Sequence, residues 1–299
     1  MNKLIGNSKR ELVRWRKWLR TQFVALSGAQ GEDHRGEKLI FLFGCGRSGT
    51  TFLSEALGKH PDTLLLVERR EIWHRYFPEL NVRTRKDAIL GPGFIEPFNS
   101  ERSVGIRRFL DKYRRQKGKK LILEKLPLNS FRMAFLREVF PEARFIYIER
   151  NGLDVAKSIQ IRAAAGWWGK NENKWRLLKE YAKTVDAYHW IGRARNHFDR
   201  GLMEWRLSTD AAHQELNQID PDRYHMVSYE KLVRNFEEEM KACFDFIGLT
   251  SPAFDGMELR NTAVKTMRTD ALQEEIGGER LKKQLSSLQE FGIIEWERS

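Results

Sequence analysis

The sequence predicts an α/β fold, in which a central parallel sheet of about five strands is flanked by helices and carries a helical insertion. Short apolar runs, with Gly, Pro or Asp near their ends, have the length and composition of buried strands. Helical segments follow most of these runs, which is the alternation that builds a parallel sheet. A glycine-rich turn follows the first run directly and opens a helix. The expected strands span residues 39–43, 63–67, 121–125, 144–149 and 224–230.

The chain divides into two parts. Its 299 residues, 41% of them hydrophobic, suffice for one large domain, or for one domain with an elaboration. Residues 38–299 are expected to form this domain, with the helical insertion at about 160–218. Residues 1–37 are predicted to be a basic amphipathic helix and a linker, because Ser8 and Glu11 form a capping-box pattern before apolar residues at helical spacing. Docking on the protein's own body, contact with a membrane surface and oligomerisation all fit this helix.

Composition bears on partners and compartment. A net charge of +12 and a pI of about 9.7 favour an anionic partner such as a nucleotide, a membrane surface or nucleic acid, although a basic surface also serves solubility alone. The two cysteines, Cys45 and Cys243, cannot form a disulfide framework, and neither a signal peptide nor an apolar run of about 20 residues is visible. We therefore expect a cytoplasmic protein, associated with membranes if the N-terminal helix binds lipid. The histidines lack metal-ligand spacing, so no metal site is predicted.

The stretch after the first strand has the features of a phosphate-binding loop. Gly44 and Gly49 have the spacing of the glycines of an NTPase P-loop, and Thr51 lies in the first turn of the helix that follows. Backbone N–H groups, hydroxyls and the positive helix end therefore converge on one anion. Thr50, however, stands where a P-loop has lysine, and Arg47 supplies the cation. This pattern indicates a phosphate-rich ligand without the triphosphate–magnesium arrangement; the alternative is a glycine turn that binds nothing.

Charged residues end three of the predicted strands. Glu68 ends the second strand and Lys125 the third, and Arg150 follows the fourth. The carboxyl ends of parallel strands form the mouth of an open sheet, where such folds bind ligands. Ser158 lies on the next helix, and Arg162 follows one turn later on the same face. The alternative for Glu68 is a salt bridge with a neighbouring arginine, Arg69 or Arg70.

Between these strands, residues 81–120 are the most cationic part of the chain. Ser103 is expected to cap a helix with one apolar stripe, and the other side of this helix is a solvated basic face or an anion site for an acceptor. The stripe comprises Ile106, Phe109, Leu110 and Tyr113. Another helix is predicted at 129–139, after Pro127 stops the third strand.

The predicted insertion is rich in tryptophan. It contains Trp167, Trp168, Trp175, Trp190 and Trp205. These side chains line an acceptor pocket or pack the core of the insertion, and the sequence favours neither.

These motifs carry a resemblance to a known family. Gly-x-x-Arg-Ser-Gly-Thr-Thr at 44–51 resembles the 5′-phosphosulfate loop of sulfotransferases that use 3′-phosphoadenosine-5′-phosphosulfate (PAPS), in the R-S-G-T-T branch that includes tyrosylprotein and many bacterial enzymes. Arg150 and Ser158 match the family's 3′-phosphate site in type, spacing and context, and Y-E-x-L-V at 229–233 resembles its C-terminal unit. The resemblance covers 39–70, 121–162 and 224–249, and it implies a P-loop core like that of nucleotide kinases.

The resemblance implies a sulfotransferase that moves the sulfuryl group of PAPS to a hydroxyl, releases adenosine 3′,5′-bisphosphate (PAP) and needs no metal. Glu68 follows Arg47 at the spacing of the catalytic glutamate of tyrosylprotein sulfotransferases, so it is the implied base, with Glu71 or His74 in reserve. Arg47 and Lys125 would stabilise the transition state. Pro127 stands where the cytosolic branch has a catalytic histidine. The implied cofactor-binding residues are Arg47, Ser48, Gly49, Thr50, Thr51, Arg150, Ser158, Arg162 and Tyr229.

Two other functions remain possible from the residues. One is a small-molecule kinase that uses ATP; the other is a basic, non-catalytic module that binds nucleotide, RNA or membrane. Buried positions expected for Arg47 and Arg150 at strand ends disfavour the second, so no nucleic-acid partner is expected. The acceptor is open among lipid, glycan, steroid-like and peptide hydroxyls. The R-K-G motif that closes the site in the cytosolic branch is absent, and Lys265 or Arg268 could close the cofactor site instead.

Overall fold

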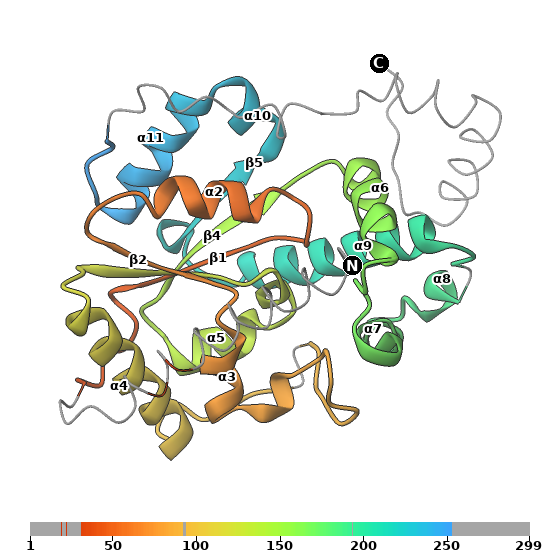
Figure 1. Cartoon of the computed structure of the whole chain (residues 1–299), viewed down its shortest axis with the longest axis horizontal. Coiled ribbons are helices and arrows are strands. Elements are labelled where there is room, and N and C mark those ends of the chain that lie inside the picture. The colour runs from red at the N-terminus through yellow and green to blue at the C-terminus, as the bar shows by residue number, and fades with distance from the viewer. Residues whose placement is uncertain (1–18, 20–21, 23–30, 92–93, 193, 253–299) are drawn as a thin grey trace, which may run out of the picture.

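The structure is a computed structural model that describes residues 19, 22, 31–91, 94–192 and 194–252 (Figure 1). Most of the predicted N-terminal helix lies outside the described residues. The two candidates for closing the cofactor site, Lys265 and Arg268, lie outside them too.

The sheet has five parallel strands, as predicted: β1 (Leu39–Phe43), β2 (Thr63–Val67), β3 (Leu121–Lys125), β4 (Arg144–Glu149) and β5 (Tyr224–Ser228). Their order is β2-β3-β1-β4-β5, so β1 lies between β3 and β4. Leu42 of β1 is opposite Lys125 of β3, and Phe43 is opposite Tyr147 of β4. The segment that follows β1 is consequently flanked by the ends of β3 and β4.

Helices cover both faces of this sheet (Figure 1). On one face lie α2 (Thr50–Leu57), α10 (Tyr229–Arg234) and α11 (Phe236–Ile247); on the other lie α3 (Arg70–Tyr76), α4 (Glu101–Gln116) and α5 (Met133–Val139). Beyond the carboxyl ends of the strands, at the right of Figure 1, are α6 (Gly152–Ala163), α7 (Asn173–Thr184) and α8 (Tyr188–Ile191). From there α9 (His197–Leu216) runs back toward the centre of the picture, where its His213 packs against Tyr147 of β4. Short 3₁₀ turns occur at Pro78–Leu80, Pro127–Phe131, Lys170–Glu172 and Pro221–Arg223.

The alternation of side chains along β1 creates two cores. Phe41 and Phe43 belong to the larger core, with α4, α5 and the insertion, whereas Ile40 and Leu42 belong to the smaller core under α2 and α11. All five residues of β1 are buried, as expected for a central strand of a parallel sheet. The sheet is therefore a rigid base for the loops at its carboxyl edge.

Two predicted boundaries are wrong. The fifth strand ends at Ser228 rather than at 230, because the Ser228 hydroxyl accepts a hydrogen bond from the Lys231 amide and so caps α10. The helix predicted at 129–139 is a 3₁₀ turn up to Phe131 followed by α5. Local capping and turn chemistry overrode the apolar pattern at both places.

The basic helix α4 differs from its prediction in two respects. Ser100 rather than Ser103 caps it, since the Ser100 hydroxyl accepts a hydrogen bond from the Ser103 amide at 3.1 Å. The predicted apolar stripe is buried, but the rest is not simply a solvated basic face. Arg107 is buried against Asp33 and donates to the carbonyls of Phe98 and Val139 at 2.9 and 3.0 Å, and Arg114 is buried as well.

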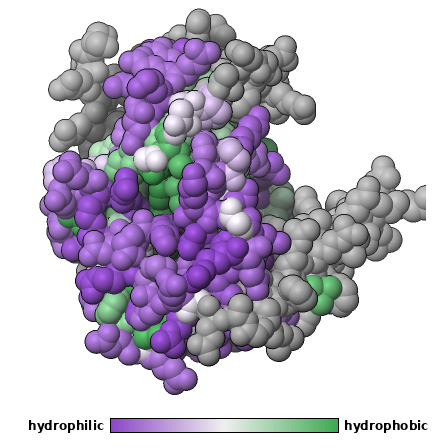
Figure 2. Space-filling view, turned by 90° about the vertical axis from the view of Figure 1, so that its left-hand side faces the viewer, coloured by the Kyte–Doolittle hydropathy of each residue, from purple (hydrophilic) through white to green (hydrophobic). Residues whose placement is uncertain are grey.

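The face shown in Figure 2, which lies at the left in Figure 1, is mostly hydrophilic. Its main group of hydrophobic residues lies in a central hollow, and smaller groups lie near the lower edge. Among the described helices, none combines the length and the apolar character that crossing a bilayer requires.

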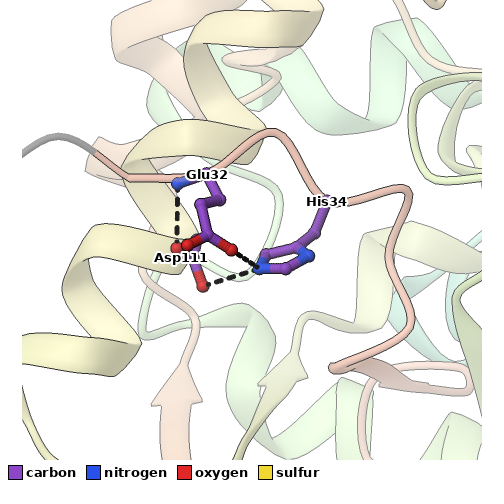
Figure 3. Close-up of side chains that lie close together, drawn as sticks. All are labelled: Glu32, His34 and Asp111. Atoms are coloured by element: carbon purple, nitrogen blue, oxygen red, sulfur yellow. Dashed lines mark hydrogen bonds and ion pairs between the residues drawn. The ribbon is translucent and has the colours of Figure 1, made fainter.

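One cluster outside the sheet's mouth contains side chains that can bind metals. His34 Nε2 lies 3.2 Å from Glu32 Oε2 and 3.3 Å from Asp111 Oδ1 (Figure 3). Both carboxylates already have arginine partners, Arg115 for Glu32 at 2.6 Å and Arg114 for Asp111 at 2.7 Å. Because these cations balance the negative charge, we interpret the cluster as a link between residues 31–37 and α4.

Candidate active site

The loop between β1 and α2 has the backbone of an anion cradle. Gly49 has φ 92°, and a Cβ atom there would lie 2.4 Å from the Tyr229 ring. A Cβ on Gly44 would lie 2.1 Å from the carbonyl oxygen of Ile148. Arg47 also adopts a left-handed backbone, with φ 79°. Glycine is therefore required on both sides of Arg47, and the turn aims the start of α2 into the mouth of the sheet.

Three cations and two unsatisfied donors surround this cradle. Partial desolvation by the surrounding protein, followed by the charges of Arg162 and Arg150, lowers the pKa of Arg47, even though much of this side chain is exposed. The Ser48 hydroxyl and the Arg150 Nε are buried without a hydrogen-bond partner. Clustered like charges and unsatisfied buried donors are costly unless an anion completes them. The residues present thus fit a ligand that carries phosphate groups.

On the β4 side of the loop, the structure brings together the residues predicted for the 3′-phosphate. Arg47 Nε donates to Ser158 Oγ at 2.9 Å. Arg150 donates to Asp154 at 3.2 Å and to the Arg47 carbonyl at 3.4 Å, and its guanidinium lies 4.3 Å from the centre of the Tyr229 ring. Burial was expected for both arginines: Arg47 is exposed, whereas the side chain of Arg150 is only 13% exposed. The sequence missed the direct contact between Arg47 and Ser158.

On the β3 side lies a second group, around Lys125. The lysine is 1% exposed, and its Nζ donates to Thr51 Oγ1 at 2.8 Å and to Glu68 Oε1 at 3.0 Å. The backbone N–H of Glu68 donates to the carbonyl of Lys125, on the neighbouring strand, at 2.8 Å. The ends of β2 and β3 thereby place a carboxylate and an ammonium beside the first turn of α2.

Glu68 is held in its ionised form. Burial by itself raises the pKa of this carboxyl, but the nearby charges of Arg70 and Lys125 outweigh burial, and the net pKa lies below its ordinary value. Arg70 forms a salt bridge with Glu68 at 2.5 Å. The salt bridge considered from the sequence is therefore present, with Arg70 as its partner, and it leaves one Glu68 oxygen facing Lys125.

The two reserve bases lie in different surroundings. Glu71 is paired with the buried Arg69, which also donates to Tyr113 at 3.2 Å. Burial, with the charges of Arg132 and Arg70, lowers the pKa of His74 to about 4, so this imidazole is neutral at pH 7.

A small hollow beside Glu68 was not predicted. It is lined by Arg70, Trp73, His74, Leu80, Asn81, Val82, Arg83, Leu126, Leu128 and Arg132. Arg132 is buried, and burial together with Arg70 lowers its pKa to about 9. The residue pattern around Arg132 predicted an ordinary helix and did not indicate a buried arginine at this place. Arg70, which pairs with Glu68, lines this hollow, whereas Glu68 itself does not.

The tryptophans of the insertion mainly pack its core. Trp168 and Trp175 are buried against each other, with ring centres 5.4 Å apart. Trp167 donates to Glu204 at 2.7 Å, and Trp205 donates to the carbonyl of Arg150 at 3.0 Å. The side chain of Trp190 lies outside what the structure describes. These contacts favour the packing alternative over an aromatic acceptor pocket.

Comparisons with known proteins identify relatives. A family model described as "Sulfotransferase family" matches residues 40–253. Protein-tyrosine sulfotransferase from Drosophila melanogaster is 24% identical over 223 residues, which cover 72% of this chain and 38% of that protein. The chain thus spans well under half the length of this relative.

Among solved structures, sulfotransferase STF9 from Mycobacterium avium matches with a TM-score of 0.45 and 15% identity, covering 85% of this chain and 77% of that one. Mouse sulfotransferase SULT7A1 complexed with PAP matches with a TM-score of 0.41 and 16% identity, covering 85% and 83%.

Proposed function

This chain belongs to the sulfotransferase family, and we propose that it transfers the sulfuryl group of PAPS to a hydroxyl of its acceptor. The observation that carries the proposal is the pair of groups on either side of the cradle. Lys125 with Glu68 lies on the β3 side, and Arg47 with Ser158 lies on the β4 side. The Lys125–Glu68 side offers a base and a cation for chemistry at a hydroxyl. The Arg47–Ser158 side offers hydrogen-bond donors for a second phosphate group.

We assign the phosphates and the adenosine of PAPS to residues on these two sides of the cradle. Arg150, Ser158 and Arg162 would bind the 3′-phosphate, and Tyr229 would lie near the adenosine. The 5′-phosphate would occupy the cradle, with Arg47 between the two phosphates. The cradle residues in contact would be Ser48, Gly49, Thr50 and Thr51. Backbone N–H groups and the positive end of α2 support an anion at this point.

PAPS would supply an activated sulfuryl group. Glu68 would accept the proton of the acceptor hydroxyl as its oxygen bonds to sulfur, while the bond from sulfur to the phosphate oxygen breaks and its electron pair leaves with PAP. Lys125 and Arg47 would stabilise the negative charge that grows on that phosphate oxygen. The Drosophila relative's name points to a tyrosine hydroxyl for that protein; for this chain, peptide, lipid and glycan hydroxyls are all acceptor classes to test. A mass-spectrometric screen of native extract incubated with PAPS would identify the product.

PAP should raise the melting temperature of the protein, whereas ADP should raise it far less. A ligand that binds only the folded state stabilises it by mass action, by about 2.7 kcal/mol at 100 times its Kd. ADP lacks the 3′-phosphate that Arg150 and Ser158 are proposed to bind. The measurement is differential scanning fluorimetry with each nucleotide, with and without magnesium. Equal shifts, or a shift that requires magnesium with ADP or ATP, would favour the kinase instead.

The rate should depend on pH through Glu68. Its lowered pKa keeps it ionised at neutral pH, so activity should be lost only as pH falls through a value below the ordinary 4.5. Arg70→Met removes one of the cations that lower this pKa and should shift the acid limb of kcat/KM to higher pH. Arg75→Met, on the exposed side of the same helix, is the matched control and should leave the limb in place. An acid limb that stays fixed in the Arg70 variant would argue against Glu68 as the titrating base.

A further inference from the structure

The helical insertion touches the phosphate-binding loop at one glycine. A Cβ atom on Gly46 would lie 2.6 Å from Cη2 and 2.8 Å from Cζ2 of Trp167. Gly46 does not adopt a left-handed backbone, unlike Gly49, so the indole rather than the φ angle excludes a side chain there. The edge of this ring therefore rests on the peptide that leads into Arg47.

Trp167 is fixed from behind by a buried ion pair. Its Nε1 donates to Glu204 Oε2 at 2.7 Å, and Glu204 also binds Lys174. The Lys174 ammonium lies 4.2 Å from the centre of the Trp167 ring. Both charged residues are buried, so the pair has little freedom to move. The hydrogen bond and the cation–π contact define the orientation of the indole.

The next residue of α9 supports the other half of the site. Trp205 donates to the Arg150 carbonyl at 3.0 Å, and a Cβ on Gly152 would lie 2.6 Å from its ring. Glu204 and Trp205, adjacent on one helix, thus reach the two segments that carry Arg47 and Arg150. The insertion therefore contacts both segments that carry the proposed phosphate-binding arginines.

We propose that Trp167, anchored by Glu204 and Lys174, is a positioning residue that holds the Gly46–Arg47 peptide in the conformation needed to bind the 5′-phosphate of the donor. This rests on the proposed use of PAPS. Trp167 acts through the loop and touches no reacting atom. Its loss should weaken ligands that carry a 5′-phosphate more than ligands that lack one, because the 5′-phosphate makes most of its proposed contacts with the loop.

The test is a double-mutant cycle on Gly46 and Trp167. Gly46→Ala inserts a methyl group where the indole lies, so the loop or the ring must move, and PAP affinity should fall about tenfold or more. Trp167→Phe lacks the two atoms that the methyl group meets and should cost less. In the double variant the methyl group has room. The fold increase in its Kd for PAP should therefore be smaller than the product of the two single-variant fold increases, by about threefold or more.

Calorimetric Kd values for PAP and for adenosine 3′-phosphate separate positioning from general damage. The Gly46 and Trp167 variants should lose much more affinity for PAP than for adenosine 3′-phosphate. Trp168→Phe is the matched control, because this neighbouring buried indole donates instead to His197, at 3.2 Å. It should change neither Kd.

The outcomes are distinguishable. A wild-type protein that does not bind PAP would overturn the proposed function and this inference with it. A wild-type protein that binds PAP, with additive effects in the cycle or equal losses for both nucleotides, would overturn the inference alone.

Discussion

Replacing Lys125 with Met should lower kcat by about 10²-fold or more, the scale of losing one aimed donor. The lysine is almost fully buried beside Thr51 and Glu68, at the first turn of α2. There it would reach the phosphate oxygen whose negative charge appears only as the bond to sulfur breaks. An interaction that grows toward the transition state affects kcat more than ground-state binding. PAP affinity should accordingly change much less, since PAP has no sulfuryl group to lose.

Arg150→Met is the matched comparison, since it removes a cation from the opposite side of the cradle. The Arg150 variant should lose more in affinity for PAP than in the single-turnover rate of the bound complex. The measurement pairs a calorimetric Kd for PAP with a single-turnover rate for both variants. If the Lys125 variant lost affinity and rate in equal measure, this lysine would be a cofactor anchor rather than a catalytic group.

Replacing Glu68 with Gln should reduce turnover by roughly 10²–10⁴-fold, the usual effect of losing a general base. Gln has nearly the same shape and can still accept a hydrogen bond from Lys125, but it cannot take a proton from the acceptor. PAP binding should stay near normal, because the groups assigned to the phosphates lie across the loop. The rate is measured under single-turnover conditions, so that product release does not hide the change.

Glu71→Gln is the control for this experiment, since Glu71 is engaged with Arg69. It should retain most of the activity. If Glu68→Gln turned over like the wild type, His74 would become the first alternative, because it is neutral at pH 7 and lies on α3, the helix that begins two residues after Glu68.

The sequence by itself determined the parts of the site. Short apolar runs predict the strands, and the glycines around Arg47 predict the turn, because strand composition and turn chemistry are local properties of the chain. It also placed Glu68, Lys125 and Arg150 at strand ends. It went wrong where local signals competed, as at Ser228, where a cap replaces the last strand residues.

Only the tertiary structure decided how these parts meet. The strand order places the cradle between the ends of β3 and β4, which divides the candidate site into a Lys125 side and an Arg47–Ser158 side. The support of Gly46 by Trp167 likewise joins segments far apart in the chain. Such contacts depend on how helices and strands pack, and hydrophobic periodicity defines the buried face of an element without naming the element that covers it.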